Sequence, residues 1–121
     1  MQLLFVYNAN AGRANAVLDS MHKILSPSTY DCKLCELTFG AFTERNIWKE
    51  FRKNSNVNMR FLHKDEFKKE FRSKWLPKYN FPVVLIQNEN KLELFITSEE
   101  FEALHSPQVL IKLIQDRLPL Y

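Results

Sequence analysis

Two cysteines three residues apart, Cys32 and Cys35, are the residues whose type and spacing point most directly to chemistry. In a C-x-x-C motif one thiolate attacks a substrate disulfide and the second thiol resolves the mixed disulfide. Cys32 lies on the N-terminal side and is the expected nucleophile, and Lys33 beside it favours a thiolate. The motif therefore predicts thiol–disulfide exchange, with a protein thiol or disulfide as the partner.

The two cysteines can act together only if the local backbone brings them close. In a strand they would point to opposite faces, with Cα atoms about 10 Å apart, whereas a disulfide needs about 7 Å or less. Turn-forming residues at 26–28 and Asp31 permit a turn or a helical start here. Two outcomes stay open: adjacent exchangeable thiols, or separate buried thiols that pack as small hydrophobes.

The same cysteines supply half of a zinc-binding pattern. The sequence contains no second C-x-x-C motif, and His22, His63 and His105 are isolated from one another. His22 is the nearest further ligand, so the candidate metal set is Cys32, Cys35 and His22, which lacks a fourth member. We therefore expect no metal and no cofactor.

Length and composition limit the number of domains and the cellular compartment that we expect. The chain has 121 residues and a net charge of +3, which suits one domain over residues 1–121. The apolar run at 3–7 is too short to span a bilayer and lacks a basic leader, so we expect a cytoplasmic protein with no membrane partner. In a reducing cytosol a cysteine pair is more often free, catalytic or metal-bound than a structural disulfide. Composition says nothing of the oligomeric state.

The middle of the chain is basic, with eleven Lys or Arg and five Asp or Glu between residues 44 and 78. Within it, Phe67, Phe71 and Trp75 recur at i, i+4 and i+8, which places them on one helix face. Core packing accounts for such a row, and the cations then form a solvated outer face. Nucleic-acid binding by stacking and phosphate contact is therefore not expected.

Hydrophobic periodicity predicts the elements that position the cysteines. The expected order is β-α-β-α-β-α-β-β-α, with a capping box from Thr97 to Glu100 and Pro107 in the first turn of the last helix. This order predicts an α/β domain with a mixed sheet and helices on both faces. The expected strands are 3–7, 35–39, 57–62, 83–86 and 92–96, and the expected helices are 13–25, 43–54, 67–75 and two after residue 97.

The segment 80–91, NFPVVLIQNENK, resembles thioredoxin-like proteins at the start of their closing hairpin. In that family a proline at this point follows a cis peptide bond beside the redox site, and the resemblance carries this role to Pro82. It implies a three-layer thioredoxin-like α/β/α fold. It also implies a site surface at the loop 8–12 and Pro82, formed by Asn8, Asn10, Gly12 and Pro82.

The chain departs from the thioredoxin-like pattern at the cysteines. The family places C-x-x-C after the first core strand, at the start of the next helix, but the loop 8–12 has Asn8 and Asn10 and no cysteine. The loop after the strand expected at 35–39 has none either, so the motif is displaced. The segment 22–38 also resembles small uncharacterised bacterial proteins, which implies no activity. Three functions remain open: a thiol-redox protein using Cys32 and Cys35, a non-enzymatic module that binds a partner through the 8–12 and Pro82 surface, or a Cys/His metal-binding protein.

Overall fold

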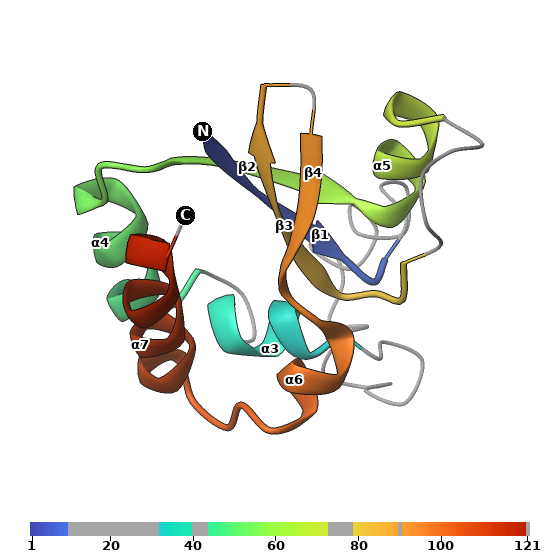
Figure 1. Cartoon of the computed structure of the whole chain (residues 1–121). Helices are drawn as coiled ribbons and strands as arrows, with labels where there is room; N and C mark the ends of the chain where they lie inside the picture. The colour runs from blue at the N-terminus through green and yellow to red at the C-terminus, as the bar shows by residue number, and fades with distance from the viewer. Residues whose placement is uncertain (10–31, 40–43, 73–78, 90, 121) are drawn as a thin grey trace.

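In the computed structural model of the chain, four strands form one mixed sheet in the order β2-β1-β3-β4 (Figure 1). The structure describes residues 1–9, 32–39, 44–72, 79–89 and 91–120. The elements within these residues are β1 (Gln2–Tyr7), α3 (Lys33–Thr38), α4 (Asn46–Asn54), β2 (Asn58–His63), α5 (Lys64–Glu70), β3 (Val83–Asn88), β4 (Lys91–Ile96), α6 (Ser98–Glu102), α7 (Pro107–Arg117) and a short 3-10 turn, η2 (Leu118–Leu120).

The first strand, β1, lies inside the sheet because its side chains are apolar on both faces. It pairs parallel to β2, with Phe5 opposite Phe61, and antiparallel to β3, with Phe5 opposite Val84. The strand β4 closes an antiparallel hairpin on β3 through a turn in which Glu89 has a φ of 59°. The hairpin and the buried runs at 3–7 and 83–86 are confirmed.

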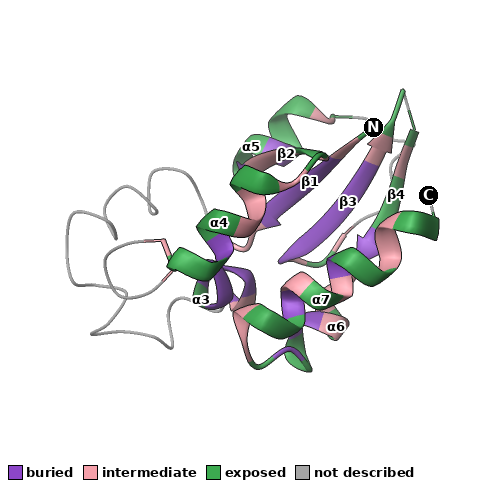
Figure 2. Cartoon of the chain, turned by 90° about the vertical axis from the view of Figure 1, so that its left-hand side faces the viewer, coloured by how far each residue is buried: buried purple, intermediate pink, exposed green. Residues whose placement is uncertain are grey.

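Helices cover both faces of this sheet, since alternate residues of β1 enter two separate cores. Leu3 and Phe5 join a large cluster that includes residues of α3, α4, α6 and α7. Leu4 and Val6 join a smaller cluster with Phe67 of α5. Figure 2 shows β1 and β3 as buried ribbons between these layers. The mixed α/β class expected from the sequence is therefore confirmed.

The strand expected at 35–39 is wrong: residues 33–38 form the helix α3. The Cys35, Leu37 and Phe39 alternation suggested a strand, but Leu34 and Thr38 are buried as well. Thr38 can be buried because its hydroxyl donates to the Leu34 carbonyl at 2.8 Å, which satisfies its polar group inside the core. The expected element order changes accordingly, from a strand to a helix at this point.

Several other expectations are confirmed or corrected at the level of single residues. The Thr97–Glu100 capping box is present, and α7 begins at Pro107. The apolar side chains of Ile47 on α4 and Val109 on α7 are 39% and 45% exposed, so these two helices do not bury all of their apolar residues. The expected helix at 13–25, together with Asn10, Gly12, His22, Thr43 and Trp75, lies outside the described residues. No helix within the described ranges is long and apolar enough to cross a membrane.

An arginine from the end of α7 ties the hairpin to α6. Arg117 donates to the Phe95 carbonyl at 2.7 Å and forms a two-armed ion pair with Glu100. Glu100 also accepts from the Thr97 backbone N–H at 2.9 Å. The pKa of Glu100 is lowered to about 2, chiefly by the hydrogen bond from Arg117.

We expect this ion pair to make stability acid-sensitive. Because the pKa of Glu100 in the folded chain lies below its ordinary value, its contribution is full above about pH 5 and disappears as the pH falls towards about 2. After allowance for solvent screening, Arg117→Met should lower the free energy of unfolding by about 1–2 kcal/mol at neutral pH. Urea unfolding at a series of pH values measures this difference.

The matched control is Lys112→Met, which breaks the exposed Lys112–Asp116 pair on the same helix. Its effect should stay within about 0.5 kcal/mol at every pH. Part of the Arg117→Met loss will remain in acid, since the bond to Phe95 does not titrate. A difference that is the same at neutral and acidic pH would show that Glu100 is not the partner that matters.

Candidate thiol site

The structure brings Cys32 and Cys35 together as a disulfide. Their Cα atoms are 5.2 Å apart, well inside the range that a disulfide requires. The pair is adjacent because residues 33–38 are helical: a strand would have separated the two sulfurs, as the sequence alone also allowed. The structure therefore has the two sulfurs adjacent, and not separated as in a strand.

Cys32 occupies the N-cap position of α3, where its sulfur meets backbone donors. Its own backbone is extended, and its carbonyl accepts from the Glu36 N–H at 3.1 Å, the first bond of the helix. Its Sγ accepts from the Cys35 N–H at 3.2 Å and from the Asn8 N–H at 3.4 Å. Two N–H groups directed at one sulfur favour negative charge on that sulfur.

The carboxyl end of β1 lies next to the Cys32 sulfur, because Asn8 donates to it. Asn8 follows the last residue of β1, and Val6 is paired with Val83 at the start of β3. The antiparallel register therefore places Pro82 at the same end of the sheet as Asn8. The Phe81–Pro82 peptide bond is cis, as the resemblance implied. Asn10 and Gly12, the other members of the expected surface, lie outside the described residues.

Both cysteines are buried, whereas the redox interpretation expected adjacent and accessible thiols and the partner-binding interpretation expected buried thiols that face apart. Cys32 is 1% exposed and Cys35 is 4% exposed, and both belong to the large apolar cluster with Leu34 and Trp48. A substrate can therefore reach the sulfur only after a local opening of the structure. Adjacency is the feature that exchange chemistry requires, whereas burial is the feature of two thiols that serve as core residues.

Charged groups surround the site, and most are paired with one another. Lys33 lies 3.7 Å from Glu36 on the exposed side of α3. At the end of β2, the His63 ring contacts Glu66 at 2.6 Å, and the His63 backbone N–H donates to the same oxygen at 2.8 Å. That backbone hydrogen bond is the main cause of the lowered pKa of Glu66. Lys64 donates to the Asn8 side chain at 3.3 Å.

The described residues contain no group of three His, Cys, Asp or Glu side chains placed to hold a metal ion. The His63 ring already contacts the Glu66 carboxylate through Nδ1. His105 lies past the end of α6 and is exposed. His22, the expected third ligand, lies outside the described residues. The described part of the chain thus offers Cys32 and Cys35 without a further ligand.

The basic middle of the chain packs as the sequence predicted where it is described. Phe67 is buried in the smaller cluster and stacks with Phe71 at a ring separation of 5.0 Å. The helix α5 ends at Glu70, however, so Phe71 is its C-cap rather than an interior position. Among the cations, Arg60 is paired with Glu70 and Arg52 with Glu44. Phe67 is therefore a core residue, and Phe71 is half-buried against the same cluster.

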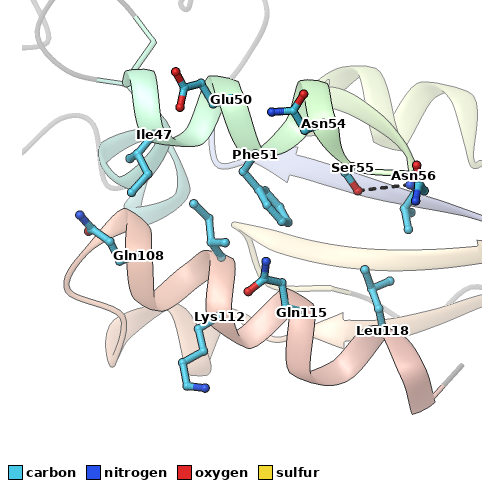
Figure 3. A pocket seen from close by; sticks show the side chains of 12 residues that line it. Ile47, Glu50, Phe51, Asn54, Ser55, Asn56, Gln108, Lys112, Gln115 and Leu118 are labelled. Carbon is cyan, nitrogen blue, oxygen red and sulfur yellow. Dashed lines mark hydrogen bonds between the residues drawn. The ribbon is translucent and has the colours of Figure 1, made fainter.

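A groove of about 770 Å³ runs between α4 and α7, on the sheet face that the cysteines also occupy (Figure 3). Figure 3 shows Phe51 directed from α4 into the space between the two helices, with Gln108 and Gln115 on the α7 side. Neither cysteine lines this groove. It is a feature separate from the thiol site.

No protein-family model, curated protein or solved structure matches this chain. Function must therefore be argued from the site itself. Sequence reasoning identified the two cysteines and, through the resemblance, placed Asn8 on the site surface, but it missed the hydrogen bond from the Asn8 N–H to the sulfur and missed the side chain Lys64. Their contacts join residues that are 24 and 56 positions apart, so no local spacing could indicate them.

Proposed function

We propose that this chain is a small thiol–disulfide oxidoreductase with a thioredoxin-like fold, acting through Cys32 and Cys35. The observation that carries the proposal is the placement of Cys32. Its sulfur is within disulfide reach of Cys35 and accepts two backbone N–H groups. That arrangement stabilises a thiolate and supplies a resolving thiol beside it.

The strand arrangement supports the thioredoxin-like part of the proposal. The sheet order is β2-β1-β3-β4, with β2 parallel to β1 and β3 antiparallel to it. The cysteines stand at the start of a helix, as in the family pattern, because residues 33–38 form α3 and not the strand expected at 35–39. The motif nevertheless stays displaced along the chain, since Asn8 directly follows β1 and Cys32 comes 24 positions later.

The exchange would proceed in two balanced steps. The Cys32 thiolate attacks one sulfur of a substrate disulfide, R–S–S–R′, forms a Cys32–S–S–R bond and releases R′–S⁻. The Cys35 thiolate then attacks the Cys32 sulfur, forms the Cys32–Cys35 disulfide and releases R–S⁻. Two electrons pass from the protein dithiol to the substrate, and solvent protonates the released thiolates. A reducing compartment such as the cytoplasm would regenerate the dithiol.

A purely structural role explains this disulfide poorly. A cross-link stabilises mainly by restricting the unfolded chain, and the effect grows with loop length. A loop of about four residues gives roughly 2 kcal/mol, against about 3 kcal/mol for one of about fifteen. The disulfide also joins two residues of the first turn of α3, and the hydrogen bond from the Glu36 N–H to the Cys32 carbonyl already stabilises that turn. The short loop therefore favours a role in thiol–disulfide exchange over a role in stabilising the fold.

Thiol reactivity tests the proposal. We expect the reduced, folded protein to be oxidised by glutathione disulfide to the Cys32–Cys35 disulfide, reversibly, within the range of cytosolic glutathione poise. Because both sulfurs are buried, their reaction should require a local opening, and its rate should change little at low urea concentrations. Mass spectrometry after acid quenching, across redox buffers and urea concentrations, measures both properties.

The double variant Cys32→Ser/Cys35→Ser is the matched control for non-thiol reaction. A reaction rate that rises with urea in step with global unfolding would contradict the proposal, since the thiols would then be reached only in the unfolded chain. That outcome would favour the second candidate, a non-enzymatic partner-binding module. The observation behind this candidate is the burial of both sulfurs.

A further inference from the structure

Lys64 is connected to the thiol site through residues 8 and 9, although 32 positions separate it from Cys32 in the sequence. Its backbone N–H donates to the Ala9 carbonyl at 3.1 Å, and its Nζ donates to the Asn8 side-chain oxygen at 3.3 Å. Asn8 is the residue whose backbone N–H reaches Cys32 Sγ at 3.4 Å. The first residue of α5 therefore clamps the segment that supplies one of the two donors to the sulfur.

We propose that Lys64 is a positioning residue for the Cys32 thiolate: through its bonds to Asn8 and Ala9 it holds the Asn8 N–H on the sulfur. The inference rests on the proposed function, because it concerns the reactive sulfur of that site. It goes beyond the C-x-x-C motif, which contains the two cysteines and, in this chain, Lys33 between them.

Two physical effects act in the same direction. A charge-assisted hydrogen bond from the ammonium fixes the Asn8 side chain, and the bond to Ala9 fixes the next peptide, so the Asn8 N–H loses little freedom when it meets the sulfur. The positive charge that Lys64 brings to Asn8, the residue that donates to the sulfur, acts in the same direction, because a cation favours the thiolate over the thiol. Lys64 itself is half-buried, which limits screening of its charge by solvent.

Other charges near the site are balanced locally. Lys33 is paired with Glu36 on α3, His63 with Glu66 across the end of β2, and Glu100 with Arg117 where α6 and α7 adjoin α3. Other titratable groups on the adjoining described elements include Tyr7 of β1, Arg60 of β2, Asp65, Lys68, Lys69 and Glu70 of α5, Glu99 and Glu102 of α6, and Lys112 and Asp116 of α7. Of the cations named here, Lys64 is the one hydrogen-bonded to the residue that contacts Cys32 Sγ.

Ultraviolet absorbance of the thiolate tests the inference without requiring a reagent to enter the site. In the Cys35→Ser background Cys32 is the only thiol, and subtracting the spectrum of Cys32→Ser/Cys35→Ser removes the tyrosine signal. We expect Lys64→Met to raise the pH midpoint of thiolate formation by about 0.5–1 pH unit, which is about a 3–10-fold smaller thiolate fraction below the midpoint. Lys64→Arg should stay close to the parent.

Two further variants separate positioning from a general effect of charge or folding. Asn8→Ala keeps the lysine but removes its acceptor, and we expect it to raise the midpoint in the same direction. Lys69→Met removes an exposed charge from the same helix and should leave the midpoint unchanged. Circular dichroism of each variant confirms folding before titration.

The outcomes distinguish this inference from the proposed function. If the parent titrates like an ordinary thiol, near about pH 8.5, the proposed function itself loses its support. If the parent titrates clearly lower and Lys64→Met matches it, the oxidoreductase proposal stands and the role of Lys64 is overturned. An equal rise in Lys64→Met and Lys69→Met would also overturn it, because the effect would then be one of net charge.

Discussion

In the Cys35→Ser variant, Cys32 should be trapped as a stable mixed disulfide with glutathione. The Cys32 thiolate attacks glutathione disulfide, forms Cys32–S–S–glutathione and releases one glutathione thiolate. Without a thiol at position 35, nothing in the chain can resolve that bond, since these are its only two cysteines. The unsubstituted protein should instead pass to the internal disulfide without accumulating the adduct.

The reciprocal variant Cys32→Ser should form its adduct at least about 100-fold more slowly. The reason is the asymmetry of the site: the backbone N–H groups of Asn8 and Cys35 are both directed at the Cys32 sulfur. Burial does not distinguish the two sulfurs, since both residues belong to the same cluster at 1% and 4% exposure, so the difference in rate rests on these donors. Intact-mass spectrometry of samples quenched over time gives both rates directly.

Unfolded protein provides the control for intrinsic thiol reactivity. In denaturant both single-cysteine variants should form the adduct at similar rates, because the fold no longer distinguishes the two thiols. If the folded variants also react at equal rates, Cys32 is not the nucleophile. If neither folded variant reacts, the cysteines are core residues and the partner-binding module becomes the better account.

Most of the fold followed from local sequence patterns. The buried strands could be predicted because continuous apolar runs of this length suit strands covered on both faces. The hairpin, the Thr97–Glu100 capping box and the start of α7 each depend on residues close together in the chain. Such signals act over a few residues, and single-sequence patterns can report them.

Among the described residues, α3 is an element that was wrongly predicted as a strand, and it shows where local pattern is insufficient. Its residues alternate in polarity in the manner of a strand, yet the helix buries a polar residue, Thr38. That burial is stable only because of a hydrogen bond to Leu34 that exists in the helix itself. Periodicity counts Thr38 as polar and therefore outward, so it favoured the strand.

The sequence indicated the two cysteines of the candidate site, but it did not indicate the contacts that Asn8 and Lys64 make there. The spacing of Cys32 and Cys35 indicated exchange chemistry, but their adjacency depended on the conformation of α3. The donor Asn8 and the clamp Lys64 come from the ends of β1 and β2, which only the parallel pairing of those strands brings together. Their part in the site is a consequence of topology.

The largest loss of stability should come from Phe5→Ala, in the middle of β1. Phe5 is fully buried, stacks on Phe61 of β2 at 4.9 Å between ring centroids and meets Trp48 of α4 edge-on at 5.5 Å. Truncation would leave a cavity where the sheet and α4 join, at a cost of about 3–5 kcal/mol in the free energy of unfolding. Urea denaturation followed by circular dichroism measures the loss.

Val109→Ala is the control, because this apolar side chain is 45% exposed on α7. Its effect should stay within about 0.5 kcal/mol. A Phe5→Ala loss no larger than this would mean that the ring is not enclosed as described.

The same substitution also bears on the thiol site. Phe5, Cys32 and Cys35 belong to one apolar cluster, so a cavity at Phe5 should lower the free energy of the openings that expose the sulfurs. We therefore expect Phe5→Ala to speed oxidation of the dithiol, while Val109→Ala leaves the rate unchanged. If oxidation keeps its rate although stability falls, the opening that admits a substrate does not involve the core around Phe5, and the end of the sheet at Asn8 and Pro82 is the next place to test.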